Sequence, residues 1–274
     1  MEFKAFKMDG LGNDFVIIDK RKKTLNLSKA DIIKITDRNF IGCDQLIYIN
    51  PSDKFDAELE FFNPDGGKSD ACGNGTRCVA YFLSKEEKKN DISLKTEAGL
   101  LKSKILNDYV VTTNIGAAKF GWKEIPLSKE LDNKNLKIKI LDNNKKELTG
   151  GYALSVGNPH LIFFVENCEN FNLKKIGPEL ENHIYFPKKC NVTLAQVLNK
   201  KLIKVKVWER GAGLTKACGT AACATVVAAV KMNFVDKTTD VEFKDGKISI
   251  NIDEENTINM KGKVSEIKEI SIKI

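Results

Sequence analysis

The sequence is poor in several residue types that mark particular functions. Only two of its 274 residues are histidine, His160 and His183, and no two cysteines have the Cys-x2-Cys spacing of a zinc site. Only four of its 44 basic residues are arginine, and the lysines are scattered singly or in short runs. The net charge of +7 therefore indicates a solvated lysine surface, and we expect neither a bound metal nor a nucleic-acid partner.

Long apolar runs are missing as well. No stretch approaches the roughly eighteen consecutive apolar residues of a membrane span, and the first residues lack the apolar segment of a signal peptide. Seven cysteines are an odd number, and a chain with 42% hydrophobic residues can build a core without disulfides. We expect free thiols in a cytoplasmic globular protein that has no membrane partner.

The sequence contains a repeat with a period of about 146 residues. "GLGNDFVII" resembles "SVGNPHLIF", which places Asn13 145 residues before Asn158. Cys43 stands 147 residues before Cys190, and Cys72, in "SDACGNGTRCVA", stands 146 before Cys218, in "TKACGTAACATV". Three anchors in one order at nearly one spacing favour an internal duplication over chance.

Each half shows the same succession of predicted elements. The segments 28–40 and 171–183 are predicted helices, the first with Ser28 and Asp31 as an acidic form of the capping box. Alternating strands at 57–62 and 203–208 lead through a turn to a helix that begins at Cys72 or Cys218. The second of these helices is apolar nearly all round, which is typical of a helix enclosed by sheet.

These patterns predict an α/β (α+β) fold of two pseudo-symmetric domains. Each domain is expected to be a curled, mostly antiparallel sheet around a central helix, with the active site in the cleft between the two. We place the first domain at residues 1–118, completed by a C-terminal strand at 264–274, and the second at 119–263. The polar segment 128–150 is expected to carry no chemistry.

The two Ala-Cys-Gly motifs place a thiol at the start of a helix. Unpaired backbone N–H groups and the helix dipole favour a thiolate there, so we expect a pKa lowered from about 8.5 into a reactive range. The same N–H groups can bind a carboxylate. If the halves face each other, Cys72 and Cys218 could remove and return a proton on opposite faces of an amino-acid α-carbon, which points to racemisation or epimerisation.

Other interpretations of the cysteines remain open at this point. A thiol redox or metal-binding protein would use the same pair, and Cys72 and Cys218 could be close enough to form a disulfide. A pyridoxal-phosphate racemase would need a Schiff-base lysine, and none stands out. Core packing is the expected role of the remaining cysteines, which are Cys43, Cys78, Cys168, Cys190 and Cys223.

From end to end, the sequence resembles the diaminopimelate epimerase family. The resemblance rests on "GLGNDF", "GCDQ", "FFNPDG", "CGNGTRC", "SVGNPH", "FPKKCNV" and "ERGAGLTKACGT", all in one order. It implies a two-domain α/β fold and a cofactor-independent enzyme that interconverts LL- and meso-diaminopimelate, on the bacterial route to lysine and peptidoglycan. It also implies a homodimer.

The resemblance assigns roles to particular positions. Cys72 and Cys218 would be the two bases, and His160 with Glu209 would adjust their protonation. The amides that would hold the α-carboxylate are those of Gly73, Asn74, Gly219 and Thr220. The remaining substrate-binding positions would be Asn13, Gln45, Asn63, Asn158, Asn191, Glu209 and Arg210, where the arginine could bind a carboxylate and the glutamate an ammonium group. His183 has no such support and is expected to be structural.

Two positions depart from the family's commonest pattern: Leu214 stands where an acid is frequent, and Ala221 where glycine is usual. Neither change removes a proposed catalytic group. A racemase of another amino acid on the same fold, such as proline, is the alternative enzyme. The sequence leaves open which cysteine is the thiolate at rest and whether the domains close on the substrate.

Overall fold

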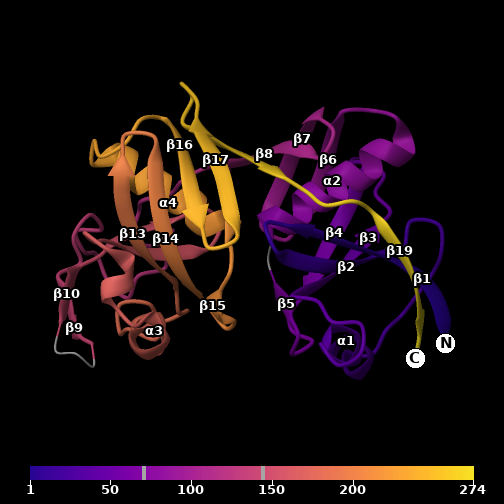
Figure 1. Cartoon of the computed structure of the whole chain (residues 1–274), viewed down its shortest axis with the longest axis horizontal. Helices are drawn as coiled ribbons and strands as arrows, with labels where there is room; N and C mark the ends of the chain where they lie inside the picture. Colours follow the sequence, from indigo (N-terminus) through magenta and orange to yellow (C-terminus); the bar gives the residue numbers. More distant parts are fainter. Residues whose placement is uncertain (70–71, 143–145) are drawn as a thin grey trace. The chain divides into compact units, whose positions relative to one another are not determined.

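The computed structural model describes residues 1–69, 72–142 and 146–274, and the chain divides into two compact units. Unit 1 comprises Met1–Ile115 and Lys261–Ile274, and unit 2 comprises Gly116–Met260 (Figure 1). The boundaries expected from the sequence, 118/119 and 263/264, lie three residues further along the chain in each case. Within the described residues, no helix is both long enough and apolar enough to cross a membrane.

Unit 1 is built on a mixed sheet with two helices. Its strands are β1 (Glu2–Gly10), β2 (Asn13–Asp19), β3 (Gln45–Asn50), β4 (Ala57–Phe62), β5 (Lys68–Ser69), β6 (Asp91–Thr96), β7 (Gly99–Asn107), β8 (Val110–Ala117) and β19 (Lys268–Lys273). Its helices are α1 (Lys29–Thr36) and α2 (Gly73–Glu87). The C-terminal strand β19 pairs antiparallel with β1, with Glu2 opposite Lys273, so the end of the chain completes the sheet of unit 1.

Unit 2 has a comparable content. Its strands are β9 (Ile138–Leu141), β10 (Glu147–Gly150), β11 (Tyr152–Ser155), β12 (Pro159–Phe164), β13 (Asn191–Asn199), β14 (Leu202–Glu209), β15 (Gly213–Thr215), β16 (Thr238–Phe243), β17 (Gly246–Ile252) and β18 (Thr257–Lys263). β18 continues into unit 1 after Met260, as β8 continues into unit 2 after Ile115. Its helices are η1 (Cys168–Asn170), α3 (Leu173–Glu181) and α4 (Gly219–Lys231). The polar segment 128–150 contains the separate β9–β10 hairpin.

The predicted repeat holds at the level of strand pairing. In unit 1, β1–β2 is antiparallel, β2–β3 parallel, β3–β4 and β4–β5 antiparallel, β4–β6 parallel and β6–β7 antiparallel. The strands β11 to β17 of unit 2 repeat this succession of directions pair by pair. The mixed α/β class is confirmed. In both units, two parallel pairs lie on either side of one antiparallel pair, β3–β4 or β13–β14.

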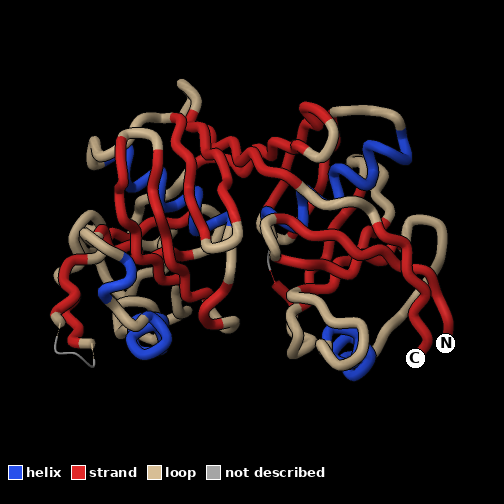
Figure 2. Tube along the Cα trace, in the orientation of Figure 1, coloured by secondary structure: helices blue, strands red, loops and turns tan. Residues whose placement is uncertain are grey.

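The central strands β2 and β3 of unit 1 are buried on both faces, which explains why β2 reads as an unbroken apolar run. Phe15 and Ile17 belong to the core cluster that includes residues of α2. Val16 and Ile18 belong to a second cluster with Ile32 of α1. Strand side chains point alternately to opposite faces, so the apolar residues of β2 pack against both helices, α1 and α2. Figure 2 distinguishes these helices (blue) from the strands (red).

A deeply buried helix lies at the centre of each unit. Every residue of α2 from Gly73 to Ser84 is buried, and α2 packs against β1, β2, β6 and β7. Residues of α4 from Ala221 to Ala229 are buried, and α4 packs against β11, β12, β13, β14, β16 and β17. A helix surrounded by strands buries its whole circumference, and α4 is apolar nearly all round as its sequence predicted.

The shorter helices end earlier than the sequence suggested. The capping box of α1 is confirmed, because Ser28 Oγ accepts from Asp31 N (3.2 Å) and Asp31 Oδ2 accepts from Ser28 N (2.9 Å). α1 stops at Thr36 and α3 at Glu181, each before the end of the predicted segment. In both units, the carbonyl of this last helical residue accepts from the amide of the cysteine that precedes the next strand (3.2 Å in each case).

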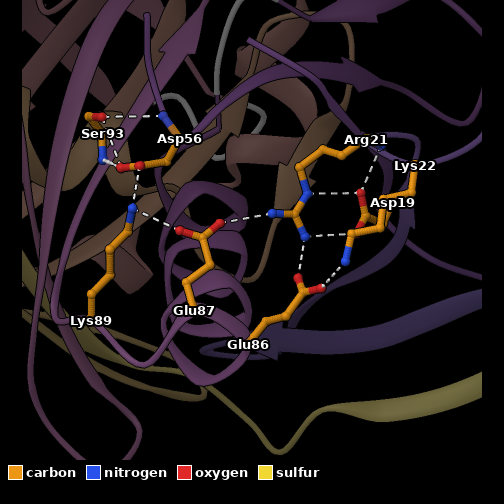
Figure 3. A network of polar contacts seen from close by, with 8 residues as sticks. All are labelled: Asp19, Arg21, Lys22, Asp56, Glu86, Glu87, Lys89 and Ser93. Carbon is orange, nitrogen blue, oxygen red and sulfur yellow. Dashed lines mark hydrogen bonds and ion pairs between the residues drawn. The ribbon is translucent and has the colours of Figure 1, made fainter. Parts of the chain in front are cut away.

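The C-terminal end of α2 is held by an ion-pair network (Figure 3). Arg21 donates to Asp19 through Nε (3.0 Å) and to Glu87 through Nη1 (2.9 Å), and it also pairs with Glu86. Both glutamates lie in the last turn of α2, where the helix dipole disfavours negative charge, and the guanidinium offsets that cost. The network continues toward β6 through Lys89, Asp56 and Ser93.

Replacing Arg21 should destabilise the protein more than replacing its neighbour Lys22. The Arg21 side chain is 13% exposed and joins three carboxylates, whereas that of Lys22 is 82% exposed and pairs with Glu86 alone. We expect Arg21→Gln to lower the free energy of unfolding by about 1–2 kcal/mol, and Lys22→Gln by less than about 0.5 kcal/mol. Urea unfolding measures both; equal losses would contradict this role of Arg21.

Candidate functional site

Cys72 and Cys218 occupy equivalent places at the starts of α2 and α4. Both are N-cap residues with extended backbones, φ −141° and ψ 111° for Cys72 and φ −135° and ψ 112° for Cys218. The first helical bonds run from Thr76 N to the Cys72 carbonyl (2.8 Å) and from Ala222 N to the Cys218 carbonyl (3.1 Å). The preceding amides lie outside the helical ladder, where an anion can bind them. They include those predicted to hold a carboxylate: Gly73, Asn74, Gly219 and Thr220.

Asparagine side chains surround Cys72 in unit 1. Its Sγ lies 3.7 Å from Oδ1 of Asn13, which also accepts from Nδ2 of Asn74 (3.3 Å). Nδ2 of Asn13 donates to Oδ2 of Asp44 (2.9 Å). These partners fix which way the Asn13 amide faces, so an acceptor oxygen is presented to the sulfur and favours its protonated form.

Arg77 supports this group from inside the core, and the sequence reasoning missed it. Its side chain is fully buried on α2, and Nη2 donates to Oδ1 of Asn74 (2.7 Å). This bond orients the Asn74 amide toward Asn13. The equivalent residue of unit 2 is Cys223, so the buried cation belongs to one unit alone. An arginine among apolar helix positions, in a chain with only four arginines, was the available signal.

Two further predicted residues of unit 1, Gln45 and Asn63, bind each other. Nε2 of Gln45 donates to Oδ1 of Asn63 (2.9 Å). Gln45 begins β3 opposite Phe15, and Asn63 directly follows β4. The structure brings these two amides together, and their contact with a substrate stays a prediction.

In unit 2, Cys218 lies among a hydroxyl, an amide and a carboxylate. Its Sγ is 3.4 Å from Oγ1 of Thr220, which in turn lies 3.4 Å from Nδ2 of Asn158. Burial raises the pKa of Cys218 well above 9.0, and the charge of Glu209 and its hydrogen bond to the thiol act in the same direction. The expectation of a lowered pKa is therefore wrong for Cys218, because desolvation outweighs the amides at the helix start.

His160 is fully buried beside this group. Its Nε2 is 2.9 Å from Oδ1 of Asn158, an atom that can only accept, so Nε2 carries the proton. Burial, together with the positive charge of Arg210, lowers the pKa of His160 to about 3. The ring is neutral at physiological pH, and within the described residues its Nδ1 has no hydrogen-bond partner.

Asn191 uses its side chain within the protein. Oδ1 accepts from the backbone amide of Arg210 (3.0 Å), and Nδ2 donates to the carbonyl of Pro159 (3.1 Å). Arg210 also donates through Nη1 to the Lys188 carbonyl (3.2 Å). Asn191 therefore fixes the backbone at Arg210, and direct contact with a substrate stays a prediction.

The strand registers show that the two groups are copies of one arrangement. Phe15 pairs with Gln45 as His160 pairs with Asn191. Asn63 directly follows β4, as Glu209 ends β14. Asn13 and Asn158 then correspond, as do Asn74 and Thr220. Asn13 contacts Asn74 in unit 1, and Asn158 contacts Thr220 in unit 2. The copies differ in charge: Glu209 replaces Asn63, and Arg77 replaces Cys223.

The departure at position 221 has a steric explanation. A methyl group at the equivalent Gly75 would come within 2.7 Å of Ile47 and 3.1 Å of Phe61. The corresponding residues of unit 2 are the smaller Thr193 and Val207, which leave room for Ala221. Leu214 is partly exposed on β15, and nothing in the structure explains it.

The remaining cysteines and His183 have structural surroundings. All seven cysteines are free, and Cys43, Cys78, Cys168, Cys190 and Cys223 are buried in the core as predicted. Burial raises the pKa of Cys43 to about 12 and that of Cys168 to about 11, so neither is reactive. His183 packs edge-on against Tyr185 with ring centroids 4.6 Å apart.

Comparison with known proteins gives a consistent result. A family model described as "Diaminopimelate epimerase" matches residues 5–121 and 152–267. The chain is 64% identical over 274 residues to a diaminopimelate epimerase of Pelagibacter ubique (strain HTCC1062), with both chains covered completely. At the level of fold, it is similar to a PhzF-family phenazine biosynthesis protein of Bacillus anthracis (TM-score 0.71, 19% identity, 100% of both chains). It is also similar to a hydroxyproline epimerase of Agrobacterium vitis (TM-score 0.72, 12% identity, 99% of this chain and 91% of the other).

The buried neutral His160 should make the protein sensitive to acid. Its pKa falls from 6.5 to about 3 on folding, so between these values the unfolded chain binds a proton that the native state does not. The stability that this provides is complete above pH 6.5 and is lost as the pH falls toward 3. We expect His160→Gln to remove roughly 2–3 kcal/mol of the loss in unfolding free energy between pH 7 and pH 4.

Urea unfolding at several pH values measures this effect. His183→Gln is the matched control, because His183 is only partly buried and should change the pH slope less. An unchanged slope in His160→Gln would contradict the assignment of a neutral buried ring.

Proposed function

The chain belongs to the diaminopimelate epimerase family, and from this premise we propose how its residues invert one α-carbon of diaminopimelate between the LL and meso forms. The chain is an isomerase, and diaminopimelate is its small-molecule substrate. The observation that carries the proposed mechanism is the equivalent N-cap position of Cys72 and Cys218 on two buried helices.

The reaction requires a base on one face of the α-carbon and an acid on the other. We propose that the two domains face each other across a cleft, so that one sulfur removes the α-proton as a thiolate and the opposite thiol donates its own proton. The C–H bond breaks toward the first sulfur, and a new C–H bond forms from the second with inverted configuration. Each sulfur changes its protonation state, so the reverse reaction uses the same residues with exchanged roles.

The intermediate carbanion needs stabilisation by its own carboxylate. Negative charge moves onto the carboxylate oxygens as the proton leaves, and donors already pointing at those oxygens favour that state. The helix-start amides of Gly73, Asn74, Gly219 and Thr220 lie outside the helical ladder and are the donors we propose. Because these amides are fixed by the helices, they need little reorganisation during the reaction.

The surroundings of the cysteines suggest their states before the substrate binds. Cys218 is 5% exposed and hydrogen-bonded to the Glu209 carboxylate, so we propose that it rests as a thiol. Cys72 faces the acceptor oxygen of Asn13. We propose that the substrate ammonium group takes over this oxygen and that Cys72 then gives its proton to solvent, so that its thiolate is the base when Cys218 is the acid.

The remaining polar residues would recognise the rest of the substrate. We propose that Arg210 binds the distal carboxylate, and that Glu209 either binds an ammonium group or adjusts the protonation of Cys218 together with neutral His160. The amide side chains proposed to complete the site are those of Asn13, Gln45, Asn63, Asn158 and Asn191. Charge complementarity with a substrate that bears two amino and two carboxylate groups supports this set.

The same mechanism bears on cofactor, compartment and assembly. Two thiols supply both proton transfers, so we propose that no cofactor takes part. A disulfide between them would remove both the acid and the base. We therefore propose that the enzyme works in a reducing compartment such as the cytoplasm, where both thiols stay reduced. There the product would serve lysine and peptidoglycan synthesis, and we propose a homodimer from the family resemblance.

The proposed function predicts solvent-derived hydrogen at the inverted carbon. With LL-diaminopimelate in D2O, the protein freed of metal and pyridoxal phosphate should form the meso isomer and place deuterium at that α-carbon, which mass spectrometry and NMR detect. Cys72→Ala and Cys218→Ala should each lower the inversion rate by at least about 10²- to 10⁴-fold.

The two buried helices also supply matched controls. Cys78 and Cys223 are buried further along α2 and α4, and Cys78→Ala and Cys223→Ala should remain active. Full activity in either Cys72→Ala or Cys218→Ala would refute the two-base mechanism. Turnover of proline, but not of diaminopimelate, would favour the alternative racemase.

A further inference from the structure

The segment with Glu209 and Arg210 is a turn whose two flanks are bound by one buried side chain. Trp208 precedes these two residues in β14, and Gly211 follows them. Glu181, the last residue of α3, is 6% exposed. Its Oε2 accepts from Nε1 of Trp208 (2.7 Å), and its Oε1 accepts from the backbone amide of Gly211 (3.1 Å).

This carboxylate leaves the turn little freedom. The Trp208 ring lies so close to α3 that a methyl group on Gly177 would come within 2.5 Å of it. The turn is closed by a bond from Ala212 N to the Glu209 carbonyl (3.1 Å). Lys189 lies 3.7 Å from Oε1 of Glu181 and partly balances the buried charge.

Unit 1 uses the equivalent position in a related way. Thr36 ends α1 as Glu181 ends α3, and in both cases the residue's carbonyl accepts from the following cysteine amide, that of Cys43 or Cys190. Oγ1 of Thr36 reaches the carbonyl of Pro64 (3.4 Å), in the turn that corresponds to Glu209–Arg210. Oγ1 of Thr36 lies closer to the carbonyl of Ile32 in its own helix (2.9 Å). The side chain at this position therefore lies beside the same turn in both copies, but only unit 2 places a carboxylate there and binds the turn with it.

We propose that Glu181 is a positioning residue for the turn from Trp208 to Gly211. By binding both flanks of this turn, it holds Glu209 and Arg210 in the orientation that substrate binding needs. The inference rests on the proposed function and extends it to a residue that touches neither substrate nor sulfur. Glu209 ends β14 and is also held by its pairing with Gly213, so its contact with Cys218 persists and the loss of Glu181 chiefly frees Arg210. The distal carboxylate that we propose for Arg210 is bound equally in the ground state and the transition state, so loosening Arg210 raises KM and leaves kcat nearly unchanged.

Glu181→Gln tests this with little change in volume. An amide can accept from only one of the two donors and turns its own N–H groups toward the other, so one charge-assisted bond is lost. We expect KM for LL-diaminopimelate to rise about tenfold or more, while kcat stays within about threefold. Glu179→Gln, on an exposed position of the same helix, is the matched control and should leave both constants within about twofold.

The split between KM and kcat separates positioning from a structural role, because a smaller folded fraction would lower the apparent kcat and leave KM unchanged. That outcome, or an unchanged KM in folded Glu181→Gln, would overturn the proposal. If Glu181→Gln does not fold, Trp208→Phe decides, since it removes the indole donor, with part of the ring, and leaves the bond from Gly211 to Glu181 in place: a raised KM supports the proposal and an unchanged KM refutes it.

Amide hydrogen exchange at Gly211, measured by NMR without substrate, tests the hold on the turn independently of turnover. Faster exchange in Glu181→Gln than in Glu179→Gln supports the positioning role, and equal exchange rules it out. An inactive wild-type protein with this difference in exchange would count against the proposed function and not against the role of Glu181.

Discussion

The proposed chemistry depends on the burial of two helices from their first turn onward. A cysteine is the N-cap of each, with nearly the same backbone angles in both units. Since the helix behind it is enclosed by strands, the sulfur and the first amides cannot move independently of the core. The sheet, the duplicated pairing order and the alternating apolar strands all serve to hold these helix starts in place.

The two copies share a backbone but differ in electrostatics, and this difference suits an acid and a base. Around Cys72 the neutral side chains of Asn13 and Asn74 are oriented by the buried cation of Arg77. Around Cys218 the carboxylate of Glu209 and desolvation raise the pKa of the thiol. The repeat supplies equivalent positions, and different residues at two of them, Glu209 for Asn63 and Arg77 for Cys223, give the copies different charges. The turn that carries Glu209 is held by the carboxylate of Glu181, whereas the corresponding turn of unit 1 lies beside a hydroxyl, that of Thr36.

Much of the fold could be predicted from the sequence, because the periodicity of apolar residues and the internal repeat can both be read without knowing which segments touch. β4 was predicted residue for residue, and the capping box of α1 and the apolar circumference of α4 were also correct. The sequence did not predict the raised pKa of Cys218, since a helix start is visible in sequence but the depth of burial is not. Arg77 and Glu181 were missed for a related reason: each acts through another residue, and such partners emerge only when strands and helices are placed together.

The most direct test is a crystal structure of the protein with a diaminopimelate analogue whose α-carbon cannot be inverted. The two-base mechanism predicts Sγ of Cys72 and Sγ of Cys218 on opposite faces of that carbon, each at about 3.5 Å, with the carboxylate on the amides at both helix starts. An α-carbon approached by one cysteine only, or a carboxylate bound away from the helix starts, would contradict it.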